Sequence, residues 1–299
     1  MESIQSKLTK VLLRIIKLNK MWKLTGDELR DSIEKRQLSE SHEPPKRIQN
    51  RFNVIKNNMN GHCYYVMKPL RNVAQKHILF LHGGGYVYEI NSMHWEFLRK
   101  LSDALRCTIT IPIYPLAPKH KHQEVFHMIV PIYQQIISDV KPKDIVIIGD
   151  SAGGGMSLAL AEVLKEKDLP QPGNIILISP ALDMSLSNTE IHGVEKVDPM
   201  LAVPSLIDIG KWCGGEKGSK HYLVSPIYGN FEGLGKISLF TGTNDILYPD
   251  AKQFKMIADE KGIKINYYEY PSMIHIWPLF FFPESKKARE QIIGIIRTS

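Results

Sequence analysis

The sequence predicts an α/β protein built on a mostly parallel β-sheet that is covered by helices. From about residue 52 onward, short β-rich runs alternate with stretches of helical periodicity, which is typical of this class. Several of the runs, such as 145–149 and 174–178, are apolar throughout, as expected for strands buried on both faces. The composition, 43% hydrophobic and 23% charged over 299 residues, allows a sizeable buried core.

The pattern predicts eight strands and five main helices. The strands are expected at 52–56, 62–67, 77–81, 108–113, 145–149, 174–178, 236–241 and 264–269. The helices are expected near 93–106, 123–139, 152–166, 250–262 and 284–297. A stretch rich in Ser, Gly and Lys, about 184–222, interrupts the alternation and is expected to insert above the sheet. The expected organisation is an N-terminal segment, 1–50, followed by one α/β domain, 51–299, that carries this insertion.

The first 40 residues have a helical pattern with an apolar stripe on one side. The stripe comprises Ile4, Leu8, Val11, Leu12, Ile15, Leu18 and Trp22. Residues 1–24 hold six basic side chains and one acidic one, Glu2, so this segment carries +5 of the chain's net charge of +7. The other residues therefore sum to only +2, and nucleic-acid binding is not expected. We expect the stripe to pack as part of a cap; contact of residues 1–24 with a membrane surface is the alternative.

The cysteines and histidines give little support for a metal site. Cys63, Cys107 and Cys213 are odd in number and widely spaced, which indicates reduced thiols in a cytoplasmic protein. The histidines of Pro118–His122 are interleaved with lysines and have no acidic ligand between them. No metal site is expected. No run of 18 apolar residues is present, so no membrane span is expected.

The strongest chemical signal is the G-x-S-x-G motif Gly149–Gly153, placed between an apolar strand and a helix. A chain that reverses this sharply at Ser151 holds the serine in a strained conformation, with its hydroxyl above the sheet edge. The helix that begins at Ala152 directs its N-terminal dipole at that hydroxyl. The context therefore predicts a nucleophilic serine rather than a plain tight turn.

A glycine-rich loop, His82–Tyr86, directly follows the strand 77–81. Its glycines allow backbone N–H groups to converge on one point, which in acyl transfer is the oxyanion of the tetrahedral intermediate. We assign the oxyanion hole to Gly83, Gly84, Gly85 and Ala152, with the amides of the last three as the main donors. His82 is expected to brace the loop.

A nucleophilic serine needs a base and an acid that orients the base. His275 follows the last expected strand, which is where the base of such a fold lies. Asp245 follows the strand 236–241 and is the expected acid, while Asp250, after Pro249, is expected to cap a helix. Neighbours of the three motifs are expected to bind substrate: Tyr86, Asp150 and Trp277.

At these residues the chain resembles the hormone-sensitive-lipase group of α/β-hydrolases. The resemblance spans roughly residues 77–280 and rests on six motifs: His82–Tyr86, Tyr114–Pro118, Gly149–Gly153, Ser179-Pro180 with Asp183, Asp245–Leu247, and His275. It implies an eight-stranded sheet, a cap built from the N-terminal segment and the insertion, and hydrolysis of short to medium acyl esters without metal or cofactor. Pro115 and Lys119 replace the arginine and glutamate usual in the second motif, which puts a supporting charge network in doubt.

The sequence thus predicts a serine hydrolase that cleaves small carboxylic esters through an acyl-enzyme. An amidase or deacetylase using the same residues is the first alternative. A ligand receptor on the same fold is the second, although it would not need Ser151, Asp245 and His275 together. The oligomeric state and the physiological ester are left open.

Overall fold

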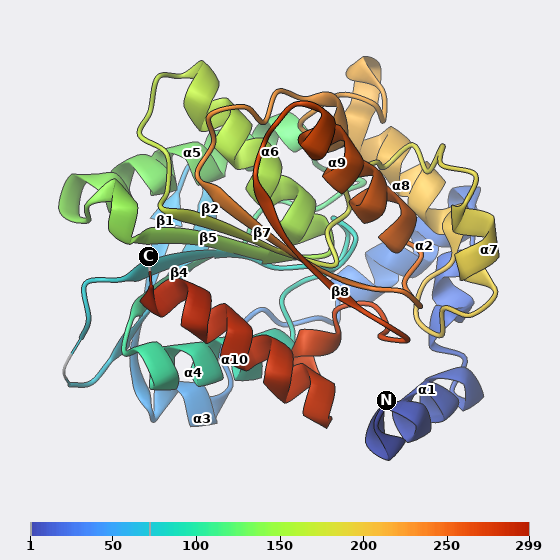
Figure 1. Ribbon diagram of the computed structural model, residues 1–299, viewed down its shortest axis with the longest axis horizontal. Helices are drawn as coiled ribbons and strands as arrows, with labels where there is room; N and C mark the ends of the chain where they lie inside the picture. The colour runs from blue at the N-terminus through green and yellow to red at the C-terminus, as the bar shows by residue number, and fades with distance from the viewer. Residues whose placement is uncertain (1, 72, 299) are drawn as a thin grey trace.

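The computed structural model describes residues 2–71 and 73–298, and its core is one eight-stranded sheet (Figure 1). The spatial order of the strands is β1-β2-β4-β3-β5-β6-β7-β8. Their bounds are β1 Phe52–Met59, β2 His62–Pro69, β3 His77–Leu81, β4 Thr108–Pro112, β5 Ile145–Asp150, β6 Asn174–Ile178, β7 Lys236–Gly242 and β8 Ile265–Tyr270. The pairs β1–β2 and β2–β4 are antiparallel, and every other neighbouring pair is parallel. All eight expected strands and the predicted fold class are confirmed.

Helices cover both faces of the sheet, because successive side chains of the central strands point to opposite sides. From β3, Ile78 and Phe80 pack in the cluster that contains α4 Ser92–Leu105 and α10 Pro283–Arg297. Leu79 and Leu81 pack on the other face, with α5 His122–Asp139 and α6 Ala152–Glu166. The helix α9 Tyr248–Glu260 covers the same face as α6 (Figure 1), and the short α3 Lys46–Gln49 precedes β1. Within the described chain, no helix is both long and apolar enough to cross a membrane.

The N-terminal segment and the insertion lie together beside the sheet, on the right of Figure 1. The insertion forms α7 Ile191–Glu195 and α8 Val203–Gly214; the N-terminal segment forms α1 Ile4–Ile15, the 3₁₀ turn η1 Leu18–Lys23 and α2 Gly26–Gln37. The Ser205 hydroxyl of α8 donates to the carbonyls of Met21 and Leu24, at 3.1 and 2.8 Å. The backbone N–H of Gly26 donates to the Asp208 carboxylate at 2.9 Å. These bonds join the two segments into one layer.

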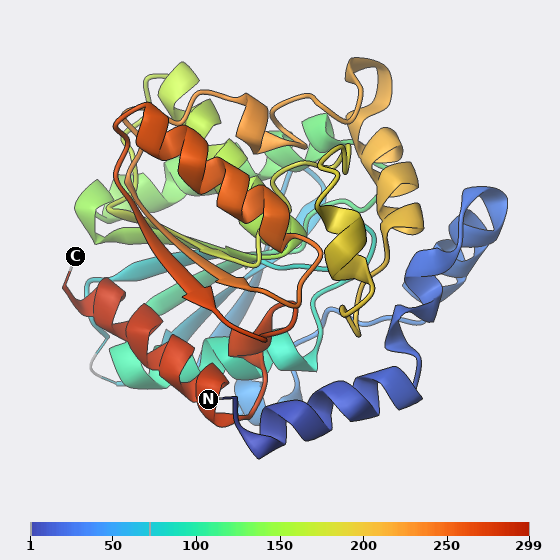
Figure 2. The ribbon, with the colours of Figure 1, turned by 45° about the vertical axis from the view of Figure 1, so that its right-hand side comes forward.

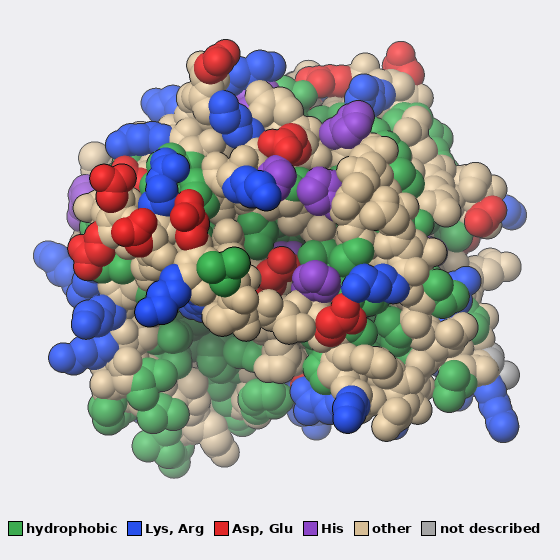
Figure 3. Space-filling view, turned by 180° about the vertical axis from the view of Figure 1, so that it is seen from behind, with side chains coloured by type: hydrophobic (Ala, Val, Ile, Leu, Met, Phe, Trp, Pro, Cys, Tyr) green, Lys and Arg blue, Asp and Glu red, His purple; other side chains and the backbone are tan. Residues whose placement is uncertain are grey.

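The expectation that the whole N-terminal apolar stripe packs inward is wrong for α1. Its five stripe residues are 50–73% exposed: Ile4, Leu8, Val11, Leu12 and Ile15. Only Trp22 of the stripe is buried, and Leu18 is partly buried. The helix lies along the side of the molecule, away from the core (Figure 2), and hydrophobic side chains gather where it lies, at the lower left of Figure 3. The opposite face of α1, with Ser6, Lys10 and Leu13, is the buried one.

Candidate active site

Ser151 occupies the sharp turn between β5 and α6 that the motif predicted. Its backbone has φ 54° and ψ −123°, a conformation that side-chain-bearing residues rarely adopt. A Cβ atom on Gly149 would lie 2.1 Å from the Gly153 carbonyl oxygen, and one on Gly153 would lie 1.9 Å from the Leu81 carbonyl oxygen. Both glycines are therefore required for the turn to pass this close to itself and to β3.

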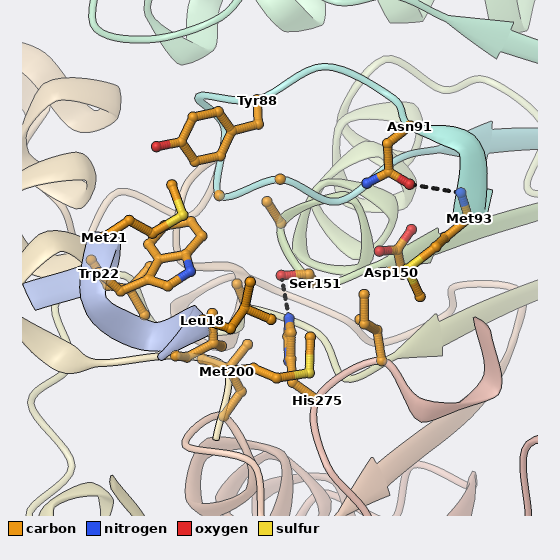
Figure 4. A pocket seen from close by; sticks show the side chains of 18 of the residues that line it. Leu18, Met21, Trp22, Tyr88, Asn91, Met93, Asp150, Ser151, Met200 and His275 are labelled. Carbon is orange, nitrogen blue, oxygen red and sulfur yellow. Dashed lines mark hydrogen bonds between the residues drawn. The ribbon is translucent and has the colours of Figure 1, made fainter. Parts of the chain in front are cut away.

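The structure brings Ser151, His275 and Asp245 into one hydrogen-bonded chain. Ser151 Oγ lies 2.9 Å from His275 Nε2, and His275 Nδ1 lies 2.9 Å from Asp245 Oδ2. Figure 4 shows the imidazole edge directed at the serine hydroxyl. Asp245 is fully buried, and its second oxygen accepts the Leu247 N–H at 3.0 Å, which fixes the carboxylate. The imidazole is thus held in the tautomer that can accept a proton from Ser151.

The electrostatic surroundings of His275 favour its protonated form. Burial lowers the pKa of this fully enclosed imidazole, but the carboxylate of Asp245 and its hydrogen bond raise it, helped by Asp198 and Asp150. The net result is a pKa above the ordinary value of 6.5. A base with this environment binds a proton readily at the moment the serine attacks.

Asp198 is a second buried carboxylate near His275, and the sequence analysis missed it. It lies in the insertion, between α7 and α8, and its Oδ1 accepts the N–H groups of Met200 and Leu201. Its Oδ2 accepts the N–H of Ile246, next to the acid Asp245, at 2.9 Å. Burial and the nearby Asp245 raise the pKa of Asp198. The one local signal was an aspartate directly before a proline, which the insertion's irregular pattern concealed.

The glycine-rich loop lies across the cavity from His275, and two of its amides are available to a ligand. Gly84 and Gly85 have positive φ values, 120° and 62°, and line the cavity with Ser151 and Ala152. In the described chain no hydrogen bond takes up either N–H. Ala152 begins α6, where backbone N–H groups lack partners within the helix. The three N–H groups therefore suit an oxyanion beside Ser151.

Gly83 does not share this role, contrary to the prediction. Its N–H donates to Asp150 Oδ1 at 3.1 Å, so it is already occupied. The other oxygen of Asp150 lies 3.2 Å from Nε2 of the buried His94. Asp150, expected to bind substrate, does line the cavity, but one of its oxygens is engaged by the Gly83 N–H and the other by His94 of α4. Asp150 thus ties the glycine-rich loop to α4 through Gly83 and His94.

His82 braces the loop, as predicted. It stacks on Tyr114 with ring centroids 4.2 Å apart, and the Tyr114 hydroxyl donates to the His82 carbonyl at 2.6 Å. Burial lowers the pKa of His82 to about 4, so its ring is neutral. A neutral, enclosed ring of this kind fills space and orients backbone rather than transferring protons.

Two expected substrate-binding residues lie elsewhere. Tyr86 is buried beyond the loop, with its hydroxyl 3.5 Å from the Val224 carbonyl, and does not line the cavity. Trp277 is fully buried against Tyr270, with ring centroids 5.0 Å apart. Both follow a motif residue in sequence, but the backbone turns there and directs the neighbouring side chain into the core. Proximity to a motif in the sequence therefore did not predict that these side chains line the cavity.

Asp250 does not cap α9 as expected. The helix has no side-chain hydrogen bond at its N-terminus, and Asp250, its third residue, is fully buried. Burial raises the pKa of this carboxyl to about 7, helped by the charge of Asp183. The carboxylate that is hydrogen-bonded to His275 is that of Asp245.

The cavity beside Ser151 has a volume of about 230 Å³ and a largely apolar wall. That wall is formed by Leu18, Met21, Trp22, Met93, Met184, Met200, Leu201, Leu206, Leu247 and Ile276. The first three come from η1 and several others from the insertion, so the layer beside the sheet shapes the cavity (Figure 4). Among residues 2–71 and 73–298, no group of three His, Cys, Asp or Glu side chains is placed to hold a metal ion.

Known proteins are similar to this chain in sequence. Residues 78–279 match a family described by its alpha/beta hydrolase fold. An esterase of Acinetobacter venetianus is 31% identical, over 73% of this chain and 74% of its own length. An acetyl-hydrolase of Streptomyces hygroscopicus is 25% identical, over 80% and 81%.

Solved structures agree. The structure of an esterase/lipase from an uncultured bacterium superposes with a TM-score of 0.85 at 26% identity and covers 99% of both chains. An esterase from the bacterial hormone-sensitive lipase family shares the fold, with a TM-score of 0.82 at 24% identity over 100% of this chain and 99% of that one. The chain belongs to the α/β-hydrolase family, as its motifs predicted.

Proposed function

We propose that this enzyme hydrolyses carboxylic esters with short to medium acyl chains through an acyl-enzyme on Ser151. The observation that carries the proposal is the hydrogen-bonded chain from Ser151 through His275 to Asp245, placed at the wall of an apolar cavity. Relatives named as esterase and acetyl-hydrolase support ester hydrolysis. A receptor would have no use for this chain of groups.

The reaction begins when His275 Nε2 removes the Ser151 proton as Oγ attacks the ester carbonyl. The resulting oxyanion accepts hydrogen bonds from the amides of Gly84, Gly85 and Ala152. His275 then protonates the leaving alkoxide and activates the water that releases the acid. Asp245 stays ionised throughout and stabilises the imidazolium, while Asp198 holds the loop that carries Asp245 through the Ile246 N–H.

The size of the cavity supports small acyl groups. Cavities that bind drug-sized ligands are roughly 300–1,000 Å³, so one of about 230 Å³ lies below that range. Its apolar wall suits an alkyl chain of a few carbons rather than a charged acyl group. The amine of an amide substrate leaves less readily than the alkoxide of an ester, so amidase or deacetylase activity is the second candidate. The acetyl-hydrolase relative favours a short acyl group.

Three broader features complete the proposal. Residues 1–50 and about 184–222 act as the cap, since these two segments supply most of the apolar wall. The enzyme works in the cytoplasm, in keeping with three free cysteines. The basic N-terminal segment contacts a lipid surface rather than a nucleic acid, because its charge accompanies an exposed apolar face.

Turnover of a p-nitrophenyl ester series, with a matching anilide, tests the substrate class. The rate constant kcat/KM should be highest for acyl chains of about two to six carbons and fall for longer chains, because the cavity is too small to hold them. The anilide should be cleaved at least about 100-fold more slowly. A preference for long chains, or for the anilide, would contradict the proposal.

Two matched substitutions test the acid. Asp245→Asn should fold normally but lose roughly three to four orders of magnitude in kcat, because the imidazole takes the wrong tautomer. Asp250→Asn, also at a buried aspartate beyond β7, should keep kcat within about tenfold. Circular dichroism checks the fold of both variants, and the opposite ranking of activities would assign the acid to Asp250.

The pH profile tests the role of Asp198. In the wild type, kcat/KM should fall as pH drops through the raised pKa of His275, above 6.5, because only the neutral imidazole accepts the proton. Asp198→Asn should move that midpoint to lower pH, since a carboxylate that raises the pKa of His275 is removed. An amide nitrogen also cannot accept the Ile246 N–H, so kcat should drop by up to about 100-fold.

Asp250→Asn is the control for this profile as well. It removes a buried carboxyl of similarly raised pKa that is not among the charges that raise the pKa of His275. Its midpoint should match that of the wild type. An equal shift in both variants, or no shift in Asp198→Asn, would make Asp198 a merely structural residue.

A further inference from the structure

The helix α1 presents its apolar face to the outside and its polar face to the protein. Ile4, Leu8, Val11, Leu12 and Ile15 recur at helical spacing on one side and are 50–73% exposed. A surface helix of a globular protein ordinarily does the reverse and buries such a stripe. Six of the most exposed large hydrophobic side chains thus lie in one short segment, since Ile16 at its end is 57% exposed. A contiguous apolar surface of this kind indicates an interaction site.

Polar contacts on the inner face fix α1 in this orientation. The Lys10 ammonium lies 2.7 Å from the Glu2 carboxylate and donates to the Ser272 carbonyl at 3.3 Å. Ser3 donates to the Glu284 carboxylate of α10 from both its N–H and its hydroxyl, at 2.6 and 2.7 Å. Arg14 donates to the Val197 carbonyl in the insertion at 3.1 Å. The apolar face is therefore directed outward by specific bonds and is not merely a poorly packed one.

Basic side chains accompany the apolar face. Lys7, Arg14, Lys17, Lys20 and Lys23 are all exposed, against the single acidic residue Glu2, which is paired with Lys10. Figure 3 shows Lys and Arg side chains around the hydrophobic cluster at the lower left, where α1 lies. An apolar face flanked by cations complements a bilayer surface with anionic headgroups. It does not complement a second copy of itself, because dimerisation would bring the two basic flanks together.

The same segment leads directly into the catalytic cavity. After α1 the chain continues as η1, whose Leu18, Met21 and Trp22 form part of the apolar wall beside Ser151 (Figure 4). A Cβ atom on the oxyanion-loop residue Gly85 would lie 2.7 Å from the Trp22 ring, so η1 touches the catalytic loop. A surface that contacts α1 therefore lies next to one wall of the cavity.

We propose that the outward face of α1 docks on an anionic lipid bilayer and places the η1 wall of the cavity against that surface. This proposal rests on the proposed ester hydrolysis for its biological use: an ester dissolved in the bilayer would pass along η1 to Ser151. The side chains that carry the docking are Leu8, Val11, Leu12 and Ile15, with Lys7, Lys17 and Lys20 for the charge. Soluble esters would reach the cavity without it.

Vesicle co-sedimentation tests the docking. The wild type should bind vesicles of 70:30 phosphatidylcholine and phosphatidylserine at moderate salt, and bind phosphatidylcholine vesicles at least about tenfold more weakly. Leu8→Gln with Leu12→Gln should weaken binding to anionic vesicles by about tenfold or more. Lys7→Gln with Lys20→Gln should weaken it about fivefold per lysine.

Leu70→Gln with Met256→Gln is the matched control. Leu70, which directly follows β2, is 66% exposed, and Met256 on α9 is 55% exposed. Both lie away from α1. This variant should bind vesicles as the wild type does. Equal loss in this variant, or a wild type that does not bind anionic vesicles, would overturn the proposal.

Two further readouts separate this proposal from others. Turnover of a soluble p-nitrophenyl ester should stay within about twofold in all these variants, whereas turnover of an ester held in anionic vesicles should fall with binding in the α1 variants alone. Loss of soluble turnover in the wild type would refute the ester hydrolysis and leave the vesicle result standing. A wild-type dimer in sedimentation velocity that dissociates in Leu8→Gln with Leu12→Gln, without vesicle binding, would assign the face to self-association and overturn the lipid proposal.

Discussion

The turn at Ser151 is the constraint on which the remainder of the site depends. The residue has a backbone conformation that costs of order 1–3 kcal/mol, and it persists because its surroundings hold it from two sides. Its N–H donates to the Ile178 carbonyl of β6 at 2.8 Å, and its carbonyl accepts the N–H groups of Gly155 and Ala181. The neighbouring strands and α6 thus fix the hydroxyl before any substrate arrives. The cavity, the imidazole and the oxyanion donors are arranged around that fixed point.

A set of buried carboxylates organises those surrounding groups. Asp245 orients the imidazole, Asp198 holds the loop of Asp245, and Asp150 holds the glycine-rich loop through the Gly83 N–H. Each accepts hydrogen bonds from backbone N–H groups or from a histidine, which offset part of the cost of burying the charge. All three also act on one imidazole and raise its pKa. Positioning and proton affinity are therefore produced by the same residues, which explains how an apolar cavity contains an effective base.

Local patterns allowed much of this to be predicted. The eight strands and the elbow at Ser151 follow from short-range apolar runs and glycines, whose effect does not depend on distant contacts. Asp245 and His275 were chosen by their places after late strands, in the order expected for this fold. The assignments that failed depended on tertiary geometry. The Gly83 amide is occupied by a carboxylate 67 residues away, and Trp277 is turned into the core by the backbone after His275. Asp198 bonds to Ile246 across 48 residues, a contact that no local signal reveals.

The orientation of α1 also depends on tertiary contacts that local sequence patterns do not reveal. Periodicity located the helix and its stripe correctly, but it could not decide whether the stripe faces the protein or the outside. That choice was made by bonds from Ser3 to Glu284 and from Lys10 to Ser272, both more than 250 residues apart. These polar contacts keep the apolar stripe exposed at a cost in free energy, and a partner that covers the stripe would remove that cost.

The central claim is that Ser151 is the one nucleophile, activated by His275. Labelling with a fluorophosphonate probe, followed by peptide mass spectrometry, tests it most directly, since such probes trap a serine only when a base activates it. We expect a single modified residue, Ser151, in the folded wild type, no labelling in Ser151→Ala, and strongly slowed labelling in His275→Ala. Modification of another serine in the folded wild type, or an undiminished rate in His275→Ala, would contradict this account.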